Sequence, residues 1–345
     1  MKKQLIVSSP PFLSNGETAH CLMFDVFIAC LPAIAAGVYF FGWRSLLIIF
    51  VGAITAKITE AVVQIFFKVS HGQLKDLITF RPFLYNTLTN DQVTVMDGSA
   101  LLTGMLLAFT LPPTVPLWIP IVGSVFGIVI GKHMFGGLGH NLFNPALAGR
   151  AFVLAAWPGF MTTWQAPVSW SASAAVDAVT TATPLAALKM QGQTTTIIDL
   201  LLGNCGGCIG ETSAVALLLG AAYMLYKGTI TWHIPFSYIG TVALLAQVLG
   251  QNPLFHIFAG GLMLGAFYMA TDVVTSPVSM YGKIMYGCGA GLVTIIIRLF
   301  GGLPEGVCYA ILVMNALAPL IDRVCTRTYK SDEVRVPLLK KVLKK

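Results

Sequence analysis

The run Ser99-Ala-Leu-Leu-Thr-Gly-Met-Leu-Leu-Ala-Phe-Thr-Leu-Pro-Pro113 decides the class of fold. It is mostly apolar, carries no charged residue, and ends at a proline pair, which does not continue a helix. The whole chain has this character, since 56% of its 345 residues are hydrophobic and 10% are charged. A soluble domain has ~25% charged residues. The sequence therefore predicts an all-α polytopic membrane protein.

About ten apolar runs divide the chain, several of them interrupted by Gly or Pro. Such runs suit membrane helices, which need ~20 residues to cross as a continuous span and can break where protein covers the backbone. A polar gap at about 159–209 separates two sets of five. The expected spans are 21–41, 45–67, 99–111, 115–134, 143–158, 212–226, 230–250, 255–271, 283–300 and 305–322.

Basic residues predict the topology. Lys/Arg lie near both termini and at the even-numbered connections, among them Lys68, Lys132, Lys227 and Lys283. By the positive-inside rule, both termini are expected on the cytoplasmic side of the membrane, with the gap 159–209 on the outer face. Residues 1–322 are expected to form one membrane domain, with halves at about 21–158 and 210–322, followed by a basic cytoplasmic tail, 323–345.

An internal echo predicts that the two halves are inverted. Phe135-Gly-Gly-Leu138 followed by Asn144-Pro-Ala-Leu-Ala148 is similar to Phe300-Gly-Gly-Leu303 followed by Asn315-Ala-Leu-Ala318. Each pair lies near the end of a five-span half. Because five is odd, the second half must run opposite to the first, an arrangement found in many transporters.

The stretch Asp177-Ala-Val-Thr-Thr-Ala-Thr-Pro184 stands out in the polar gap. Thr followed by Pro is typical of a helix N-cap with Pro at the first helical position. Pro184 also favours an extended backbone at Thr183. A phosphate attached to Thr183 would lie at a helix N-terminus, where N–H groups and the helix dipole favour an anion. The stretch is thus consistent with plain capping and with a phosphoester site.

Several motifs together carry a resemblance to a known family. They are Asp97 to Pro113, Gly136 to Phe152, Asp177 to Thr183, Gly210 to Ser213 and Phe267 to Asp272. Over essentially its whole length the chain resembles the D subunits of Rnf-type ferredoxin:NAD oxidoreductase complexes. It is also similar to the related B subunits of sodium-pumping NADH:quinone reductases, although it lacks their usual N-terminal extension.

The resemblance implies covalent FMN on Thr183, with Asp177, Thr180 and Ala182 completing the attachment motif. Ala178 and Thr181 depart from it, because the family often has Gly there. It also implies a non-covalent riboflavin. An isoalloxazine ring needs hydrogen-bonding groups beside an apolar slot. Two segments could supply these, and each could equally be a helix cap: Gly210, Glu211, Thr212 and Ser213, or Asn141 and Asn144.

Ionisable residues within or beside the spans are candidates for function, because charge at membrane depth is costly. Asp25 and Asp272 are the candidates for an ion path. Lys57 and Glu60, three residues apart, can neutralise each other on a helix. Arg150 and Arg298 could approach flavin phosphates or extend toward the membrane surface.

No catalytic residue or metal ligand is assigned from sequence. Cys205-Gly-Gly-Cys208 is a single C-x-x-C pair and cannot complete a four-thiolate site alone. The chain has no P-loop, no zinc-protease motif and no dinucleotide-binding fingerprint. The resemblance therefore assigns NAD, ferredoxin and iron–sulfur clusters to partners, namely subunits of the A, B, C, E and G types. It also implies a flavin transferase for FMN attachment and contact with membrane lipid, and nothing indicates nucleic acid.

The sequence thus predicts a membrane electron-transfer subunit that couples electron transport to Na⁺ or H⁺ translocation. Two alternatives remain: a quinone-reducing B-subunit homologue, and a small-solute channel of the urea or ammonium type. A channel leaves the polar excursion at 159–209 unexplained. The choice between Na⁺ and H⁺ is open at this stage.

Overall fold

The computed structural model describes residues 19–70, 97–167, 181–302 and 305–326, and every regular element in these ranges is helical. The first half contains α1 (Ala19–Phe41), α2 (Trp43–Ser70), α4 (Ser99–Phe109), α5 (Trp118–Phe126), the π-helix η3 (Gly127–Lys132), the short η4 (His133–Phe135) and α6 (Pro145–Ala156).

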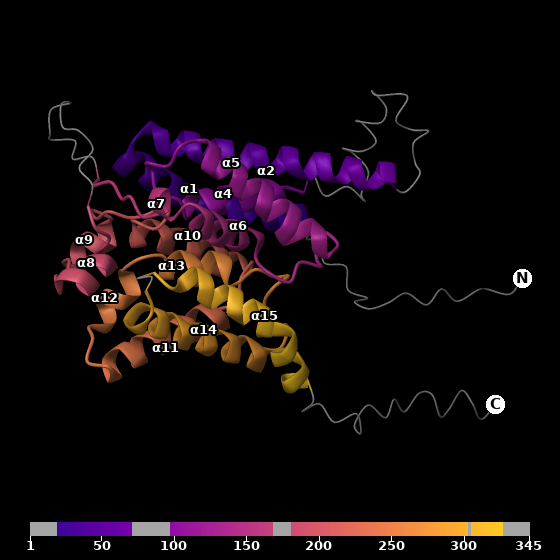
Figure 1. The fold of residues 1–345 in the computed structure, drawn as a ribbon. Helices are drawn as coiled ribbons and strands as arrows, with labels where there is room; N and C mark the ends of the chain where they lie inside the picture. Colours follow the sequence, from indigo (N-terminus) through magenta and orange to yellow (C-terminus); the bar gives the residue numbers. More distant parts are fainter. Residues whose placement is uncertain (1–18, 71–96, 168–180, 303–304, 327–345) are drawn as a thin grey trace, which may run out of the picture.

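The connection between the halves has three short helices, α7 (Pro158–Met161), α8 (Pro184–Gln191) and α9 (Ile197–Leu202). The second half contains α10 (Ala214–Lys227), α11 (His233–Val248), α12 (Pro253–Phe258), α13 (Leu262–Leu264), the π-helix η5 (Gly265–Met269), α14 (Met280–Phe300) and α15 (Val307–Thr326). In Figure 1, α8, α9 and α12 lie at one end of the bundle, far from the last turn of α15.

The helices match the expected spans closely. By length and composition, five segments could cross a membrane: 20–41, 43–66, 118–135, 280–300 and 307–325. Four shorter apolar helices, α4, α6, α10 and α11, account for four more. The one remaining expected span, 255–271, is broken into α12, α13 and η5. The prediction of a polytopic membrane protein is confirmed.

The break in this span lies at Ala259 and Gly260. α12 ends where Ala259 adopts an extended backbone, with φ −81° and ψ 134°, and Gly260 follows in a left-handed conformation, with φ +66°, that glycine adopts readily. The carbonyl oxygens of His256 and Ala259, which lose their helical partners at the break, accept hydrogen bonds from Arg298 on α14. Broken helices at membrane depth need this kind of protein cover.

Hydrogen bonds define the two ends of the bundle. At the end that holds Thr183, called here the Thr183 end, Gly210 N donates to Phe109 O at 2.9 Å and Lys189 Nζ donates to Gly301 O. The end of α4, the start of α10 and the end of α14 therefore meet there.

At the other end, the Asp272 end, Asn144 Nδ2 donates to Met269 O at 3.2 Å and Val278 N donates to Asp322 Oδ1 at 3.2 Å. The start of α6, the end of η5 and the last turns of α15 meet there. Matching helices thus run in opposite directions, so that α6 leaves the Asp272 end whereas α15 arrives at it. The inverted order expected from the repeat is confirmed.

Candidate functional site

Thr183 begins α8 as the sequence predicts. Its backbone is extended, with φ −65° and ψ 154°, and Pro184 occupies the first helical position. The hydroxyl oxygen accepts a hydrogen bond from Ala186 N at 3.2 Å. The side chain is 4% exposed. Thr183 is therefore an N-cap whose hydroxyl faces the interior.

Lys189 fixes the far end of this short helix. Its ammonium donates to the carbonyl oxygens of Arg298, at 3.2 Å, and of Gly301. These carbonyls lie at the C-terminal end of α14, where no further N–H group of the helix is available to bond to them. α8 is thus anchored at both ends, and Thr183 is held against the second half of the chain.

A small cavity lies beside Thr183. Its volume is about 20 Å³, enough for a water molecule. Glycines in its wall have no room for a side chain, because a Cβ at Gly206 would lie 2.4 Å from Thr181 Oγ1 and one at Gly260 would lie 2.8 Å from Leu185 Cδ1. The lining residues are Thr183, Pro184, Leu185, Cys205, Gly206, Gly207, Glu211, Thr212, Phe258, Gly260 and Glu305.

These residues fit the ester end of a flavin nucleotide. Thr183 offers a hydroxyl next to the free N–H groups of α8, the setting that favours a phosphate. The buried hydroxyl of Thr212, in the same cavity wall, has no hydrogen-bond partner among the described residues. The cavity has room for about one water molecule, so its walls would have to move apart to admit the phosphate, and the isoalloxazine ring would lie outside it.

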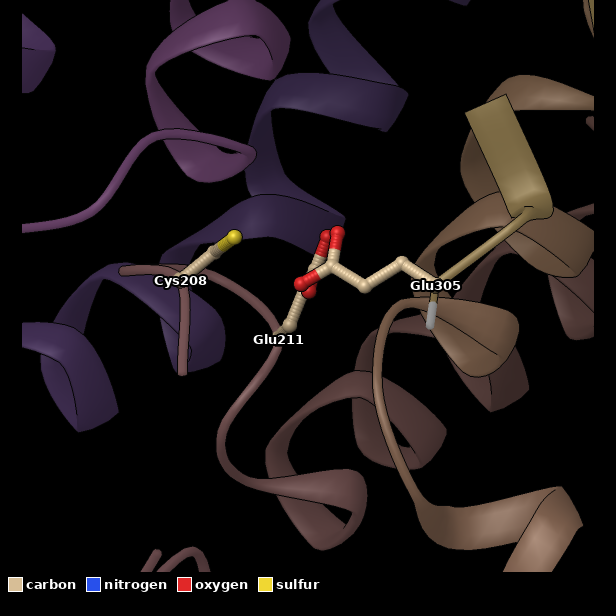
Figure 2. A group of neighbouring side chains, drawn as sticks. All are labelled: Cys208, Glu211 and Glu305. Atoms are coloured by element: carbon tan, nitrogen blue, oxygen red, sulfur yellow. The ribbon is translucent and has the colours of Figure 1, made fainter. Parts of the chain in front are cut away.

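Three charged side chains form a buried cluster next to this cavity. Arg150 Nη1 donates to Glu211 Oε1 at 2.9 Å, and Arg150 Nη2 pairs with Glu305 Oε2. Figure 2 shows the carboxylates of Glu211 and Glu305 directed toward one another, with the Cys208 thiol nearby. Arg150 does not extend toward the membrane surface, because its buried guanidinium pairs with the two glutamates. An approach of Arg150 to a flavin phosphate stays a prediction.

Glu305 is absent from the sequence-based candidates. It lies in a turn before α15 and reaches Arg150 across 155 positions of the chain. The only local signal was an acidic residue at the entrance to an apolar span, which is costly unless paired.

Cys205 and Cys208 are free thiols. Burial raises the pKa of Cys205 to about 12 and that of Cys208 well above its ordinary value, so both thiols stay protonated. Cys208 Sγ donates to Thr110 O at 3.0 Å. The pair thus behaves as packing residues at the end of α4.

The residues from Gly210 to Ser213 have two different roles, since some cap or pack against a helix and others line the Thr183 cavity. Ser213 caps α10 by accepting from Ala216 N at 3.3 Å, and a Cβ at Gly210 would lie 2.5 Å from the Phe109 side chain. Glu211 and Thr212 instead face the Thr183 cavity. Glu211 and Thr212 therefore lie beside Thr183, whereas Gly210 packs against Phe109 and Ser213 caps α10.

Asn141, Asn144 and Asp272 meet at a second cavity, at the Asp272 end, with a volume of about 100 Å³. Its wall is mostly apolar, with Leu102, Ala146, Phe267 and others. Asn144 caps α6 through Ala146 N at 3.0 Å and also donates to Met269 O. Asp272 Oδ2 accepts from Thr275 Oγ1 at 3.2 Å. Residues that the sequence treated separately, as flavin pocket and ion path, thus share one cavity.

Lys132 also lines this cavity, and it is buried. Its ammonium lies 2.6 Å from Glu60 Oε1 and 2.6 Å from Ser99 Oγ. Ser99 Oγ in turn donates to Asp97 Oδ1 at 2.7 Å. The sequence treated Lys132 as a cytoplasmic loop charge and paired Glu60 with Lys57. The structure instead gives Glu60 an ion-pair partner 72 residues away.

Asp25 lies in α1 and is not part of either cavity wall. It accepts from Tyr223 Oη at 2.9 Å, and Lys227 Nζ lies 4.0 Å from its Oδ1. Both partners belong to α10, so Asp25 joins the first helices of the two halves. Ala182 is exposed next to Thr183. Asp177 and Thr180 lie outside the described residues.

The chain is similar in sequence to known proteins over most of its length. The family model described as "NQR2, RnfD, RnfE family" matches residues 6–330. The D subunit of the Na(+)-translocating ferredoxin:NAD(+) oxidoreductase complex of Acetobacterium woodii is 47% identical, over 92% of this chain and 93% of its own length. The D subunit of the proton-translocating ferredoxin:NAD(+) oxidoreductase complex of Clostridium ljungdahlii is 42% identical, over 94% and 95%.

A third relative, the D subunit of the ion-translocating oxidoreductase complex of Stutzerimonas stutzeri, is 36% identical over 92% of this chain and 94% of its own. The matches run through both halves and the connection between them, so they cover Thr183, the Arg150 cluster and the Asp272 cavity alike. The chain belongs to the NQR2, RnfD, RnfE family.

Proposed function

We propose that this chain is the membrane electron-transfer subunit of an ion-translocating ferredoxin:NAD oxidoreductase complex, and that it carries FMN as a phosphoester on Thr183. The observation that carries the proposal is the setting of Thr183: an extended N-cap on an anchored helix, beside a cavity with an unpartnered buried hydroxyl. The names of the relatives support the assembly: two are D subunits of ion-translocating ferredoxin:NAD(+) oxidoreductase complexes, and the third is the D subunit of an ion-translocating oxidoreductase complex.

The protein residues have simple tasks in this function. The Oγ1 atom of Thr183 bears the ester, and the first N–H groups of α8 stabilise its phosphate. Lys189 holds α8 on α14, which keeps the attachment point fixed. The bound flavin supplies one-electron and two-electron redox chemistry. The proposed attachment motif also includes Asp177 and Thr180, outside the described residues.

Riboflavin is the second proposed cofactor, and the Asp272 cavity is its proposed site. Asn141, Asn144, Lys132 and Asp272 offer donors and acceptors there on an apolar wall. Its volume, about 100 Å³, is below the ~300 Å³ of small ligand pockets, so the walls must separate to admit the ring. Asp272, and less directly Asp25, are the proposed groups of the ion path.

The remaining assignments rest on the resemblance and on charge. The proposed partners are subunits of the A, B, C, E and G types, together with a flavin transferase that attaches FMN. The proposed location is a bacterial inner membrane, with both termini in the cytoplasm and Thr183 on the outer face. The start of α1 and the end of α15 lie at the end of the bundle opposite Thr183. This supports an orientation with both termini on one side of the membrane and Thr183 on the other.

The test of flavin attachment uses the intact complex, expressed together with the flavin transferase. After denaturing electrophoresis, a fluorescent band at the mass of this chain is expected under ultraviolet light. The band should vanish in Thr183→Ala and remain in Thr181→Ala. A chain without fluorescence would contradict the redox function and favour a small-solute channel. Quinone reduction that is independent of ferredoxin would favour the quinone-reductase alternative.

The riboflavin site has its own test. Ala146 is 1% exposed and lines the Asp272 cavity, so Ala146→Phe should fill part of it. Released non-covalent flavin, measured per chain by chromatography, should fall while the covalent fluorescence stays. Ala155→Phe is the matched control, because Ala155 lies on the same helix and is exposed. Equal flavin in both variants would place riboflavin elsewhere.

A further inference from the structure

The Arg150 cluster contains more negative than positive charge. One guanidinium faces two carboxylates, and the side chains of Arg150, Glu211 and Glu305 are 7%, 4% and 18% exposed. Two carboxylates that share one buried site do not both ionise easily, because each disfavours the charge of the other. The cluster is therefore one positive charge short.

A metal ion does not fill this need. Cys208, Glu211 and Glu305 lie close enough for their ligand atoms to surround an ion, within 4.8 Å of one another. The guanidinium of Arg150, however, already contacts both carboxylates and lies 3.9 Å from Cys208 Sγ. The Cys208 thiol is protonated, since burial raises its pKa. The space for a cation is taken by a side chain.

Other groups around Glu211 do not supply the missing charge directly. Arg298, on α14, is the second cation, but its N–H groups donate to the backbone oxygens of His256, Ala259 and Glu305. The remaining titratable groups that act on Glu211 or on its partners carry no positive charge. They are Cys208, Glu305, and Cys308 and Tyr309 on α15.

We propose that Glu211 and Glu305 share one exchangeable proton, and that this proton-binding site balances the charge of an electron delivered to the flavin on Thr183. The proposal rests on the proposed function, because Thr183, Glu211 and Glu305 line the same cavity. The isoalloxazine ring, which would carry the electron, lies outside this cavity, but charges in a poorly solvated protein interior act on one another over longer distances than in water. An electron added to the ring therefore raises the proton affinity of the two carboxylates.

The step is balanced. One electron comes from the donor in a partner subunit, or from an added reductant in the experiment. One proton comes from hydronium in the solvent: an O–H bond of hydronium breaks, an O–H bond forms with a carboxylate oxygen of the pair, and a water molecule is left in the solvent. Counting the electron and the proton together, the net charge of the flavin and the carboxylate pair does not change. Glu305, the more exposed of the two, is the entry point. Burial raises the pKa of Glu211 to about 7, which makes the proton exchangeable near neutral pH.

The experiment measures the midpoint potential of the covalent flavin in the purified complex between pH 6 and 9. In the wild type, the potential should fall with rising pH, by up to about 59 mV per tenfold drop in proton concentration. Glu211→Gln and Glu305→Gln should reduce this slope. Glu60→Gln is the matched control, because it alters a buried carboxylate at the Asp272 end. Equal slopes in all four proteins would overturn the proposal.

Infrared difference spectra give a second readout that needs no activity. Reduction of the flavin should produce a protonated-carboxyl band that shifts in D₂O and is missing in Glu211→Gln. A band that survives in this variant and in Glu305→Gln overturns the proposal. Repeating the potentials in NaCl and in KCl of equal strength separates proton from metal: a shift specific to Na⁺ would assign the site to a metal cation instead.

Failure of the proposed function is recognised separately. In-gel fluorescence is recorded first for each preparation. A chain without the Thr183-dependent band contradicts the flavin assignment itself, before any potential is measured. A fluorescent chain whose potential has the same pH slope with and without Glu211 contradicts only the proton site.

Discussion

Arg150 and Glu211 join the two halves of the chain. Arg150 lies in the last helix of the first half, Glu211 lies directly before the first helix of the second, and Nη1 and Oε1 are 2.9 Å apart. Arg150 is six residues after the N-cap Asn144, so it lies roughly 9 Å along α6 from the Asp272 cavity. Thus α6 lines the Asp272 cavity at its start, and through Arg150 it binds the two carboxylates that line the Thr183 cavity.

Removing the guanidinium should destabilise the protein strongly. Arg150→Met leaves Glu211 and Glu305 buried without a cation, a change that costs about 3–5 kcal/mol. The apparent melting temperature of the purified complex in detergent should fall. Adding Glu211→Gln and Glu305→Gln to Arg150→Met should recover much of the loss, because no unpaired charge then remains. A triple variant no more stable than the single one would contradict this account.

Capping and flavin attachment can be separated at Thr183. Thr183→Asn keeps an N-cap acceptor but has no hydroxyl, whereas Thr183→Ala loses both. Both variants should lack covalent flavin. Only Thr183→Ala should lose about 1 kcal/mol of stability, seen as a lower melting temperature than Thr183→Asn when both are prepared without the flavin transferase. Equal melting temperatures would mean that the cap contributes nothing.

The contact between α2 and α4 depends on glycine. A Cβ at Gly104 would lie 2.2 Å from Gly52 O, so Gly104→Ala must push the helices apart, at a cost of about 1–3 kcal/mol. In α11 a Cβ at Gly240 meets nothing within 4 Å, and Gly240→Ala should be neutral or stabilise by about 0.4–1 kcal/mol. The change in melting temperature should be clearly negative for Gly104→Ala, and near zero or positive for Gly240→Ala.

Protonation of Glu211 should contribute to the pH dependence of the protein's stability. Its pKa is raised from an ordinary value of 4.5 to about 7 by burial, partly opposed by Arg150. Between these values the unfolded carboxyl is ionised while the folded one keeps its proton. Stability should therefore fall as pH rises from about 4.5 to 7, by at most about 1.4 kcal/mol per unit, and then level off. In Glu211→Gln this component should be absent, and parallel melting profiles of the two proteins would contradict it.

Much of the fold could be read from sequence because it depends on local patterns. Apolar runs located all ten segments, and Pro184 and Pro145 marked helix starts whose caps, Thr183 and Asn144, form as expected. The break at Gly260 was harder to predict, because it lies within an apolar run. The hydrogen bond from the distant Arg298 stabilises the helix end there, and the local sequence does not indicate it.

The buried ion pairs could not be read in this way. Glu60 pairs with Lys132 across 72 positions, and Arg150 with Glu305 across 155. Neither pair has a helical spacing, so periodicity carries no information about it. Lys132 even matched the charge pattern of a cytoplasmic loop. Packing of inverted halves brings these side chains together, and only the three-dimensional structure contains that information.

The most direct measurement concerns the ester on Thr183. Trypsin should release the peptide from Ala151 to Lys189 of the intact complex, since no Lys or Arg lies between them. Tandem mass spectrometry should find it heavier by FMN less one water, with the added mass on Thr183 and not on Thr180 or Thr181. An unmodified peptide from a fully active complex, or the flavin mass on another residue, would contradict the account.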